Sequence, residues 1–398
     1  MSTCCRPADR QLAAAALLCL FLASAPAMAQ SSGGSAAPPA PPSSSQPAPW
    51  FQDLSFHGMV SSSFVINADH PRSGTNALRV FDVRDRTVTL DEVEFVVQRT
   101  PTANSRVGFR ADVTFGGSVS RVTAAAGLFR DDSGRAGDLD IHQAFASYLA
   151  PLGHGLRIDA GKFVTHIGYE VVDGYDGFND NHSRGLLFGF AEPVTHTGVR
   201  FTYVLSDVLT AQASFVNGWD NVVDNNTGKS VGLQLAVTPS PRIALTLNYL
   251  GGPEQAAENG HLRHLVNVIA TGRVTSSLSL SGSWDYGRET AVTLADTAGG
   301  GVRNATWQGL ALYAKQTLSD QFGLTLRGEW FDDPRGVRTG RPQTVRELTL
   351  TPEFRPDPRF IIRVDLRQDQ SNRAVFERRD GTAATAQFTV SLNVLFVF

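Results

Sequence analysis

The sequence predicts an all-β fold, in which about sixteen antiparallel strands close into a transmembrane β-barrel. Three observations predict it. Short segments that alternate apolar and polar residues recur from residue 54 to the end of the chain, and a period of two is typical of strands with one apolar face. The links between these segments alternate between tight and long. Charged residues repeat on one face of several segments, so that face must contact water rather than lipid.

Residues 1–29 have the features of a secretory signal peptide. Arg6 and Arg10 precede an apolar run from Leu12 to Ala25, and Ala27-Met28-Ala29 is a small-x-small cleavage site. The apolar run is too short for a membrane helix. All three cysteines lie in this segment, so the mature chain is expected to have no disulfide and no cysteine metal site, although it is exported.

The rest of the chain divides into a linker and one domain. Residues 30–49 are almost entirely Ser, Gly, Ala, Pro and Gln, which predicts a flexible linker. From Trp50 to Phe398 the composition is uniform, so residues 50–398 are expected to form a single barrel. About 350 residues are too many for a typical β-sandwich and suit one large barrel.

Sixteen strands can be placed in this domain, and an even number is what a single-chain bacterial barrel requires. The alternation is clear in Val231–Val237 and in Phe322–Trp330. The predicted strands begin near residues 54, 88, 104, 138, 155, 194, 208, 229, 242, 263, 278, 305, 322, 344, 360 and 386.

The final strand places Phe388, Val390, Leu392, Val394 and Phe396 on one face and ends on Phe398. A strand that stops on a terminal aromatic residue resembles the closing strand of bacterial outer-membrane barrels. In those proteins the pattern is an assembly signal, which implies that Phe398, Phe396 and Val394 are read by the barrel-assembly machinery. The alternative is an ordinary half-buried edge strand of a soluble β-protein.

The connections alternate in length along the chain. After even-numbered strands the link is tight, as at Pro239-Ser240-Pro241 and Ser276-Ser277. After odd-numbered strands it is long and polar, as at 68–87, 116–137, 287–304 and 369–384. Outer-membrane barrels have short periplasmic turns and long external loops, whereas a sandwich or propeller gives no reason for this alternation.

The charged face of the strands is expected to line a water-filled lumen. A charge that faces lipid at the bilayer midplane costs roughly 2–4 kcal/mol, so repeated charges must point inward. The residues expected inside are eight acidic and eight basic: Glu92, Glu94, Asp112, Asp159, Asp285, Glu329, Glu347 and Asp365, and Arg106, Arg110, Arg157, Arg200, Arg273, Arg327, Arg363 and Arg367.

Aromatic residues near strand ends on the apolar face suit the membrane interfaces. They are Trp284, Tyr286, Trp330, Tyr203 and Tyr249. The alternative for each residue is that it is simply a large side chain that faces the lipid.

The connection Lys162–Pro193, between the fifth and sixth predicted strands, is the longest. A loop of this length that folded into the barrel would act as a filter for size and charge; the alternative is a loop exposed to solvent. Its candidate constriction residues are Lys162, Glu170, Asp173, Asp176, Asp180, Arg184 and Glu192. Their acidic excess predicts a weak preference for cations if the loop folds inward.

Four stretches of this region resemble the OmpL-like family of outer-membrane β-barrel porins. They are Ala160–Phe163, Gly168–Glu170, Asn179–Phe188 and Glu192–Arg200. A weaker similarity to phosphate-selective porins rests on Gly161-Lys162-Phe163, but the chain lacks a dense ladder of lysines. The resemblance implies a diffusion channel for small hydrophilic solutes in the outer membrane of a Gram-negative bacterium. Porins with sixteen strands are often homotrimers.

Other function classes find little support. His166, His182, Ser183 and His196 could suggest a hydrolase, but no nucleophile elbow surrounds Ser183, so no enzyme activity is expected. No cofactor, metal or nucleic acid is expected either. The expected partners are outer-membrane lipids, the barrel-assembly machinery and small solutes. The alternative to a porin is an adhesion barrel with a plugged lumen.

Overall fold

The computed structural model describes residues 50–126, 128, 129, 131, 133, 135–293 and 301–398. The expected signal peptide (1–29) and linker (30–49) lie outside the described residues. Residues 50–398 form one compact unit. None of the helices in the described part of the chain is long and apolar enough to cross a membrane.

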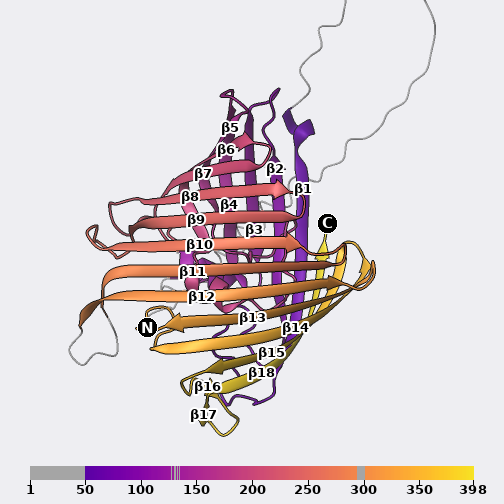
Figure 1. The fold of residues 1–398 in the computed structure, drawn as a ribbon, viewed down its shortest axis with the longest axis vertical. Helices are drawn as coiled ribbons and strands as arrows, with labels where there is room; N and C mark the ends of the chain where they lie inside the picture. Colours follow the sequence, from indigo (N-terminus) through magenta and orange to yellow (C-terminus); the bar gives the residue numbers. More distant parts are fainter. Residues whose placement is uncertain (1–49, 127, 130, 132, 134, 294–300) are drawn as a thin grey trace, which may run out of the picture. The chain divides into compact units, whose positions relative to one another are not determined.

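Sixteen antiparallel strands of this unit close into a barrel (Figure 1), which confirms the predicted fold and strand number. Each strand pairs with its neighbours along the barrel sequence, and the first and last strands, β1 (Ser55–Asn67) and β18 (Ala386–Val397), pair to close the ring. The strands between them are β2 (Thr87–Arg99), β3 (Val107–Phe115), β4 (Leu139–Ala150), β5 (Leu156–Val164), β6 (Thr195–Ser206), β7 (Leu209–Val216), β8 (Ser230–Ser240), β9 (Ile243–Pro253), β10 (Leu262–Arg273), β11 (Leu278–Thr293), β12 (Val302–Thr317), β13 (Phe322–Asp333), β14 (Gln343–Asp357) and β15 (Phe360–Ser371).

The connections alternate in length as expected. Turns such as 241–242 and 358–359 join strands at the periplasmic end, and longer loops join them at the external end. Besides the barrel strands, the described residues form three short helices and one hairpin: η2 (Trp50–Asp53), α2 (Val119–Ala126), η3 (Leu187–Ala191), and β16 (Phe376–Glu377) paired with β17 (Ala383–Ala384).

One predicted loop is too long. The expected connection 287–304 starts too early, because β11 continues to Thr293 and β12 begins at Val302. Their pairing continues through Arg288↔Thr306 and Glu289↔Ala305. The polar residues here belong to strands and not to a loop.

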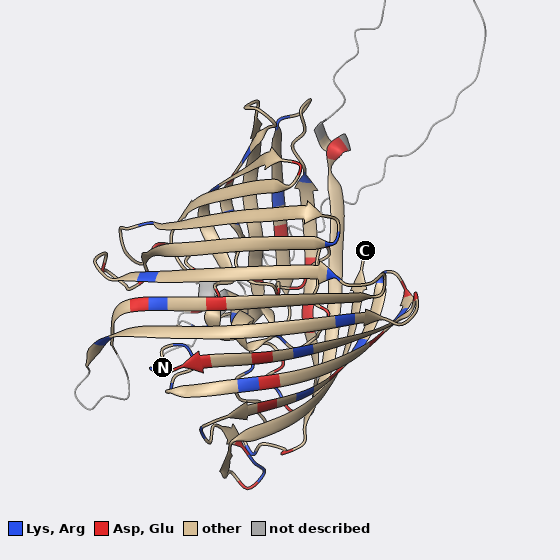
Figure 2. Ribbon diagram, in the orientation of Figure 1, with Lys and Arg blue, Asp and Glu red and all other residues tan. Residues whose placement is uncertain are grey.

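The two faces of the strands differ in polarity. On β15, Arg363, Asp365 and Arg367 are at most 1% exposed, whereas the intervening Leu366 is 36% exposed on the outer face. Figure 2 shows charges recurring along the barrel strands. Trp284 and Tyr286, in the middle of β11, are 39% and 38% exposed with stacked rings, and their place at a membrane interface stays a prediction.

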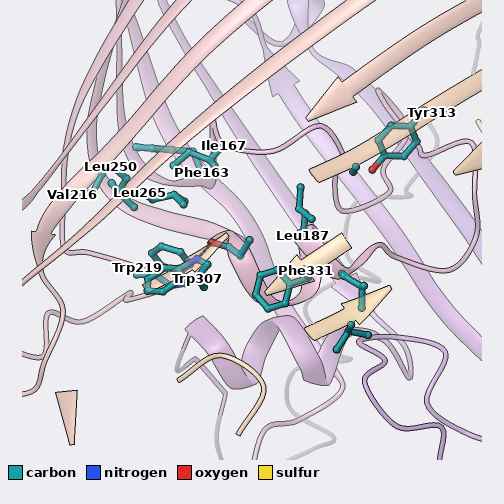
Figure 3. Packing of buried hydrophobic residues seen from close by; sticks show 14 of the residues in the cluster. Phe163, Ile167, Leu187, Val216, Trp219, Leu250, Leu265, Trp307, Tyr313 and Phe331 are labelled. Carbon is teal, nitrogen blue, oxygen red and sulfur yellow. Dashed lines mark hydrogen bonds between the residues drawn. The ribbon is translucent and has the colours of Figure 1, made fainter. Parts of the chain in front are cut away.

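The barrel interior contains an apolar core in addition to the charged wall that was predicted for a water-filled lumen. Inward residues of β4, β5, β7, β9, β10 and β12–β14 pack with the loop between β5 and β6 (Figure 3). Several inward positions on these strands are large and apolar, which the repeated charges on other strands did not indicate. The buried cluster comprises Phe145, Phe163, Ile167, Leu186, Leu187, Ala191, Val216, Trp219, Leu250, Leu265, Trp307, Ala311, Tyr313, Phe331 and Val345.

Candidate pore and the loop that crosses it

The loop between β5 and β6, residues 165–194, crosses the barrel interior; we call it the inner loop. In the ring of sixteen strands, β13 is eight positions away from β5 in either direction. The inner loop nevertheless bonds to side chains on β13 and β15, among them Arg327 and Asp365. It therefore reaches the wall opposite its own attachment.

Arg327 on β13 is the first anchor of the inner loop. Its Nη1 donates to Glu170 Oε1 at 2.7 Å and to the Ser183 carbonyl at 2.6 Å. Its Nε donates to Glu347 Oε1 on β14 at 2.8 Å. The Arg327 side chain is fully buried. A buried arginine is tolerated only when its charge and its donors are all matched, so this site fixes the loop position closely.

Asp365 on β15 is the second anchor. Its Oδ2 accepts hydrogen bonds from both the backbone amide and the hydroxyl of Ser183, each at 2.7 Å. Its Oδ1 accepts the His182 amide at 3.2 Å. Three hydrogen-bond donors of the inner loop thus converge on one carboxylate. The Ser183 hydroxyl is therefore committed to holding the loop.

Arg363 on β15 is the third anchor and reaches the predicted constriction residue Asp173. Arg363 Nη2 donates to Asp173 Oδ2 at 3.3 Å, and Arg184 Nη2 lies 3.0 Å from Asp173 Oδ1. Burial alone would raise the pKa of Asp173, but Arg184 and Arg363 hold this pKa below its ordinary value. Asp173 is therefore a buried, paired anion.

Asp176 and Asp180 are the more exposed acids of the inner loop. The Asp176 carboxylate, 48% exposed, pairs with Arg110 on β3. The Asp180 carboxylate, 23% exposed, pairs with Lys315 on β12. Lys315 was not among the predicted lumen residues, because it lies near the periplasmic end of its strand.

The tip of the inner loop rests on the β1–β2 side of the wall. Tyr175 stacks on His57 of β1 with ring centroids 4.2 Å apart. The Tyr175 amide donates to Glu94 Oε2 on β2 at 2.8 Å. The loop is thus held on both sides of the barrel.

Glu192 closes the inner loop against β11. Its carboxyl group meets that of Asp285, and two carboxyl groups can hydrogen-bond only if one of them is protonated. Burial, followed by the neighbouring Asp285 charge, raises the pKa of Glu192 well above its ordinary value. Beside it, Trp307 Nε1 donates to the Ala191 carbonyl at 3.1 Å.

The predicted constriction residue Lys162 is not on the inner loop. It lies on β5, where its Nζ donates to Asp140 Oδ2 at 2.8 Å and to the Ile141 carbonyl at 2.6 Å. The predicted loop began too early, since the Gly-Lys-Phe stretch continues the strand. Arg106 likewise lies in the turn before β3, with Nη1 donating to the Leu149 carbonyl at 3.2 Å.

The wall on the β3–β6 side carries a second set of predicted lumen residues. Arg110 Nε donates to Asp112 at 2.8 Å. Asp159 receives Arg157 Nε and Arg200 Nη2, each at 2.8 Å. The remaining predicted lumen residues lie elsewhere on the wall. Glu92 is buried, Glu329 accepts hydrogen bonds from the backbone amides of Leu186 and Leu187, and the charged groups of Glu347 and Arg367 lie 3.4 Å apart. Arg273 is exposed at the periplasmic end of β10.

A cavity of about 560 Å³ lies between the inner loop and this wall. Its lining includes Glu94, Arg110, Arg157 and Arg200 from the wall and Asp176 from the loop. Most of the apolar core comes from β7, β9, β10 and β12–β14, although its members Phe145 and Ile167 also line the cavity. The inner loop therefore lies between a largely packed region and an open cavity lined by charged residues.

Sequence reasoning missed a second loop inside the barrel. Arg79, in the connection between β1 and β2, donates from Nη2 to Asp369 on β15 and to Thr389 on β18, each at 2.7 Å. The neighbouring Phe81 lies beside Arg184, with the guanidinium 5.3 Å from the ring centroid. No spacing in a polar loop marks one arginine as inward, so sequence reasoning had no signal for it.

The histidines and Ser183 make structural contacts. His196 bonds to the Gly218 carbonyl and to Thr165 Oγ1, each at 3.0 Å. His166 Nε2 lies 3.2 Å from the Tyr249 carbonyl. Among the described residues, no three His, Cys, Asp or Glu side chains are placed to hold a metal ion.

Solved structures with the same architecture are porins and outer-membrane channels. The chain aligns over 87% of its length with the outer membrane channel DcaP of Acinetobacter baumannii (97% of that chain, 11% identity, TM-score 0.58). The same share of the chain aligns with an anion-selective porin from Comamonas acidovorans (99% of that chain, 12% identity, TM-score 0.58). It also aligns with Salmonella typhi OmpF in complex with daunomycin (97% of that chain, 12% identity, TM-score 0.58). At such low identity these matches show the fold alone. No curated protein sequence matches the chain.

A family model described as "Putative beta-barrel porin-2, OmpL-like" matches residues 53–398. The match spans the whole barrel, including the inner loop. The chain therefore belongs to this family of OmpL-like β-barrel porins, and it is an outer-membrane porin of the Gram-negative type that serves passive diffusion.

Proposed function

We propose that the inner loop is the constriction of this channel, and that small hydrophilic solutes pass between it and the β2–β6 wall. The observation that supports this path is the asymmetry of the interior. The 560 Å³ cavity lies on that side, whereas most of the apolar core comes from β7, β9, β10 and β12–β14. A loop held by Arg327, Asp365 and Arg363 would keep this opening at a constant size.

The charges that face a passing solute differ from those that the sequence suggested. Glu170 and Asp173 form buried ion pairs with arginines, so their fields are largely cancelled. Asp176 remains half exposed at the cavity, opposite Arg110, Arg157 and Arg200. The weak cation preference stays a prediction, and Asp176 is the loop residue on which it now depends.

Further parts of the proposal concern partners and processing. Residues 1–29 would be removed as a signal peptide and residues 30–49 would act as a linker. A solved structure of Vibrio cholerae OmpT is described as a trimer form, which supports a homo-oligomer here as well. The ion pairs and structural hydrogen bonds of the polar side chains support a channel without catalysis.

Recording from the refolded mature protein in planar bilayers tests the path. Asp176→Cys would introduce the only thiol of the mature chain, and a charged methanethiosulfonate reagent should then reduce the single-channel current by about half or more. Asp380→Cys, on an exposed external loop, is the matched control and should leave the current unchanged.

Two results would contradict the proposal. Equal effects of the reagent on both variants would place the constriction elsewhere. An absence of conductance steps at any voltage would favour the plugged adhesion barrel, since two loops already occupy part of the interior.

A further inference from the structure

We propose that the outer face of β12–β14 binds a phosphate-bearing lipid of the outer leaflet. Arg346 would contact the phosphate, and an acyl chain would lie in the groove beside Gly328. The proposal is independent of the path that solutes take. It rests on one outward arginine, one apolar groove and the charge of the neighbouring external loops.

Arg346 is a charged residue on the membrane-facing side of the barrel. Its neighbours Val345 and Glu347 are buried on the inner face, whereas Arg346 and Leu348 are exposed on the outer face. Arg346 lies three residues from the external start of β14, which at about 3.3 Å per residue places it near the external membrane interface. Trp330 is paired with it on β13.

Arg346 has no counter-charge among the residues that the structure describes, where it forms no ion pair and no side-chain hydrogen bond. The outward carboxylate closest in register, Asp332, is paired with Thr344 and accepts the Thr344 hydroxyl at 2.7 Å. A guanidinium at the level of the headgroups prefers an anion that accepts two parallel hydrogen bonds, and phosphate has this geometry.

An apolar groove of about 600 Å³ extends from Arg346 along the barrel. Its outward lining includes Leu310, Leu312, Leu326, Trp330 and Leu348. At its centre, a Cβ on Gly328 would meet only Leu348 Cδ1 at 3.7 Å and the Glu347 carbonyl at 3.9 Å. The missing side chain thus leaves open space between bulky neighbours, and an acyl chain fits such a space.

The external loops next to this face are rich in free arginines. Arg335 and Arg341 lie between β13 and β14, and Arg378 and Arg379 lie between β15 and β18. All four are exposed, and within the described ranges none forms an ion pair. Lipids with several phosphates would gain additional contacts here, because repeated cations at a membrane surface attract anionic headgroups.

A second groove of about 500 Å³ on β6–β9 provides the contrast. It is lined by apolar residues such as Ala213, Leu233 and Leu247, and by no charged residue. Any lipid tail can fill that groove. Of these two grooves, the one at Gly328 combines a tail-sized space with a cation that has no ion-pair partner among the described residues, which is why we assign the anionic lipid to this face.

Native mass spectrometry of the refolded mature protein in neutral detergent tests the proposal, with diphosphorylated lipid A as the probe. Arg346→Gln should weaken lipid A binding about tenfold through the loss of one charge-assisted contact. Gly328→Leu should weaken it by filling the groove. Arg273→Gln at the periplasmic end and Ala213→Leu in the second groove are the matched controls and should bind like wild type.

Competition measurements and a further variant distinguish whether the phosphate, the acyl chains or both are needed for binding. Diacylglycerol, which has two acyl chains but no phosphate, should not compete with lipid A, and inorganic phosphate should compete only weakly. Arg346→Lys should bind with intermediate affinity, and heat-modified electrophoretic mobility checks that every variant is folded. Unchanged lipid A binding by Arg346→Gln, equal competition by inorganic phosphate, or a second protein copy that replaces lipid A on this face would each overturn the proposal.

Discussion

Arg327 and Glu170 form an ion pair inside the barrel, with Nη1 and Oε1 2.7 Å apart and both side chains at most 3% exposed. One residue belongs to β13 and the other to a loop that leaves the opposite wall. The position of the inner loop therefore depends on buried charge as well as on the apolar core. Several measurable consequences follow from such an attachment.

Replacing Arg327 by Met should loosen the inner loop. It would leave Glu170 buried without its cation and Glu347 with only Arg367, 3.4 Å away, and breaking a buried ion pair in this way costs about 3–5 kcal/mol. We expect a lower unfolding temperature and larger fluctuations of single-channel current. Arg99→Gln, at a partly exposed pair with Asp53, is the control and should change stability by less than about 1 kcal/mol. Equal stability of both variants would contradict the anchor.

Asp176→Asn should shift the selectivity of the channel toward anions. The substitution removes the most exposed acid of the inner loop and leaves Arg110 paired only with Asp112. The reversal potential in a salt gradient measures this shift. Asp380→Asn, on an external loop, should have no effect. A triple neutralisation with Glu170 and Asp173 is less informative, because both of these acids hold the loop in place.

The contact between Glu192 and Asp285 should make the free energy of unfolding decrease as the pH rises. The folded state raises the pKa of Glu192 through burial and then Asp285, with Glu170 and Glu329 adding to it. The stabilisation from this bound proton is fully present below the ordinary carboxyl pKa of about 4.3, and it is lost as pH rises through the raised value.

Glu192→Gln should remove part of this pH dependence, because an amide keeps a hydrogen-bond donor at every pH. Thermal unfolding followed between pH 5 and pH 9 measures the effect, and Glu353→Gln, at the partly exposed pair with Arg355, is the control. Identical pH profiles for wild type and Glu192→Gln would exclude a shared proton.

Deleting Phe398 should impair assembly of the barrel in cells. The Phe398 backbone exchanges two hydrogen bonds with Gly58, each at 3.0 Å, and its ring lies 6.3 Å from that of Phe95. Gly58→Val should act similarly, since a Cβ there would lie 2.4 Å from the Phe398 ring. The fraction of heat-modifiable protein in the outer membrane measures both effects. Val107→Ala, on the outer face of β3, serves as the control.

The barrel could be predicted from sequence because its signal is repeated in every strand. The alternation of apolar and charged residues on β15 and the alternation of short and long connections can each be read from short stretches of sequence. The contacts of Arg327 with Ser183 and of Arg79 with Asp369 could not be predicted, because they join residues that are distant in sequence and no local period records them. Lys162 was placed at the start of the loop, although β5 continues through Gly161 and Lys162 to Val164.

The seam between β1 and β18 has a consequence for folding. Asn393 Nδ2 donates to Ser61 Oγ at 2.9 Å, although the two residues are 332 positions apart. Contacts between residues so distant in sequence form slowly, because a long stretch of chain must close into a loop before they are made. Until then the open sheet exposes two unpaired edges that can join other strands. Aggregation of the unclosed sheet therefore competes with the last pairing step, and conditions that keep chains dilute should favour correct closure.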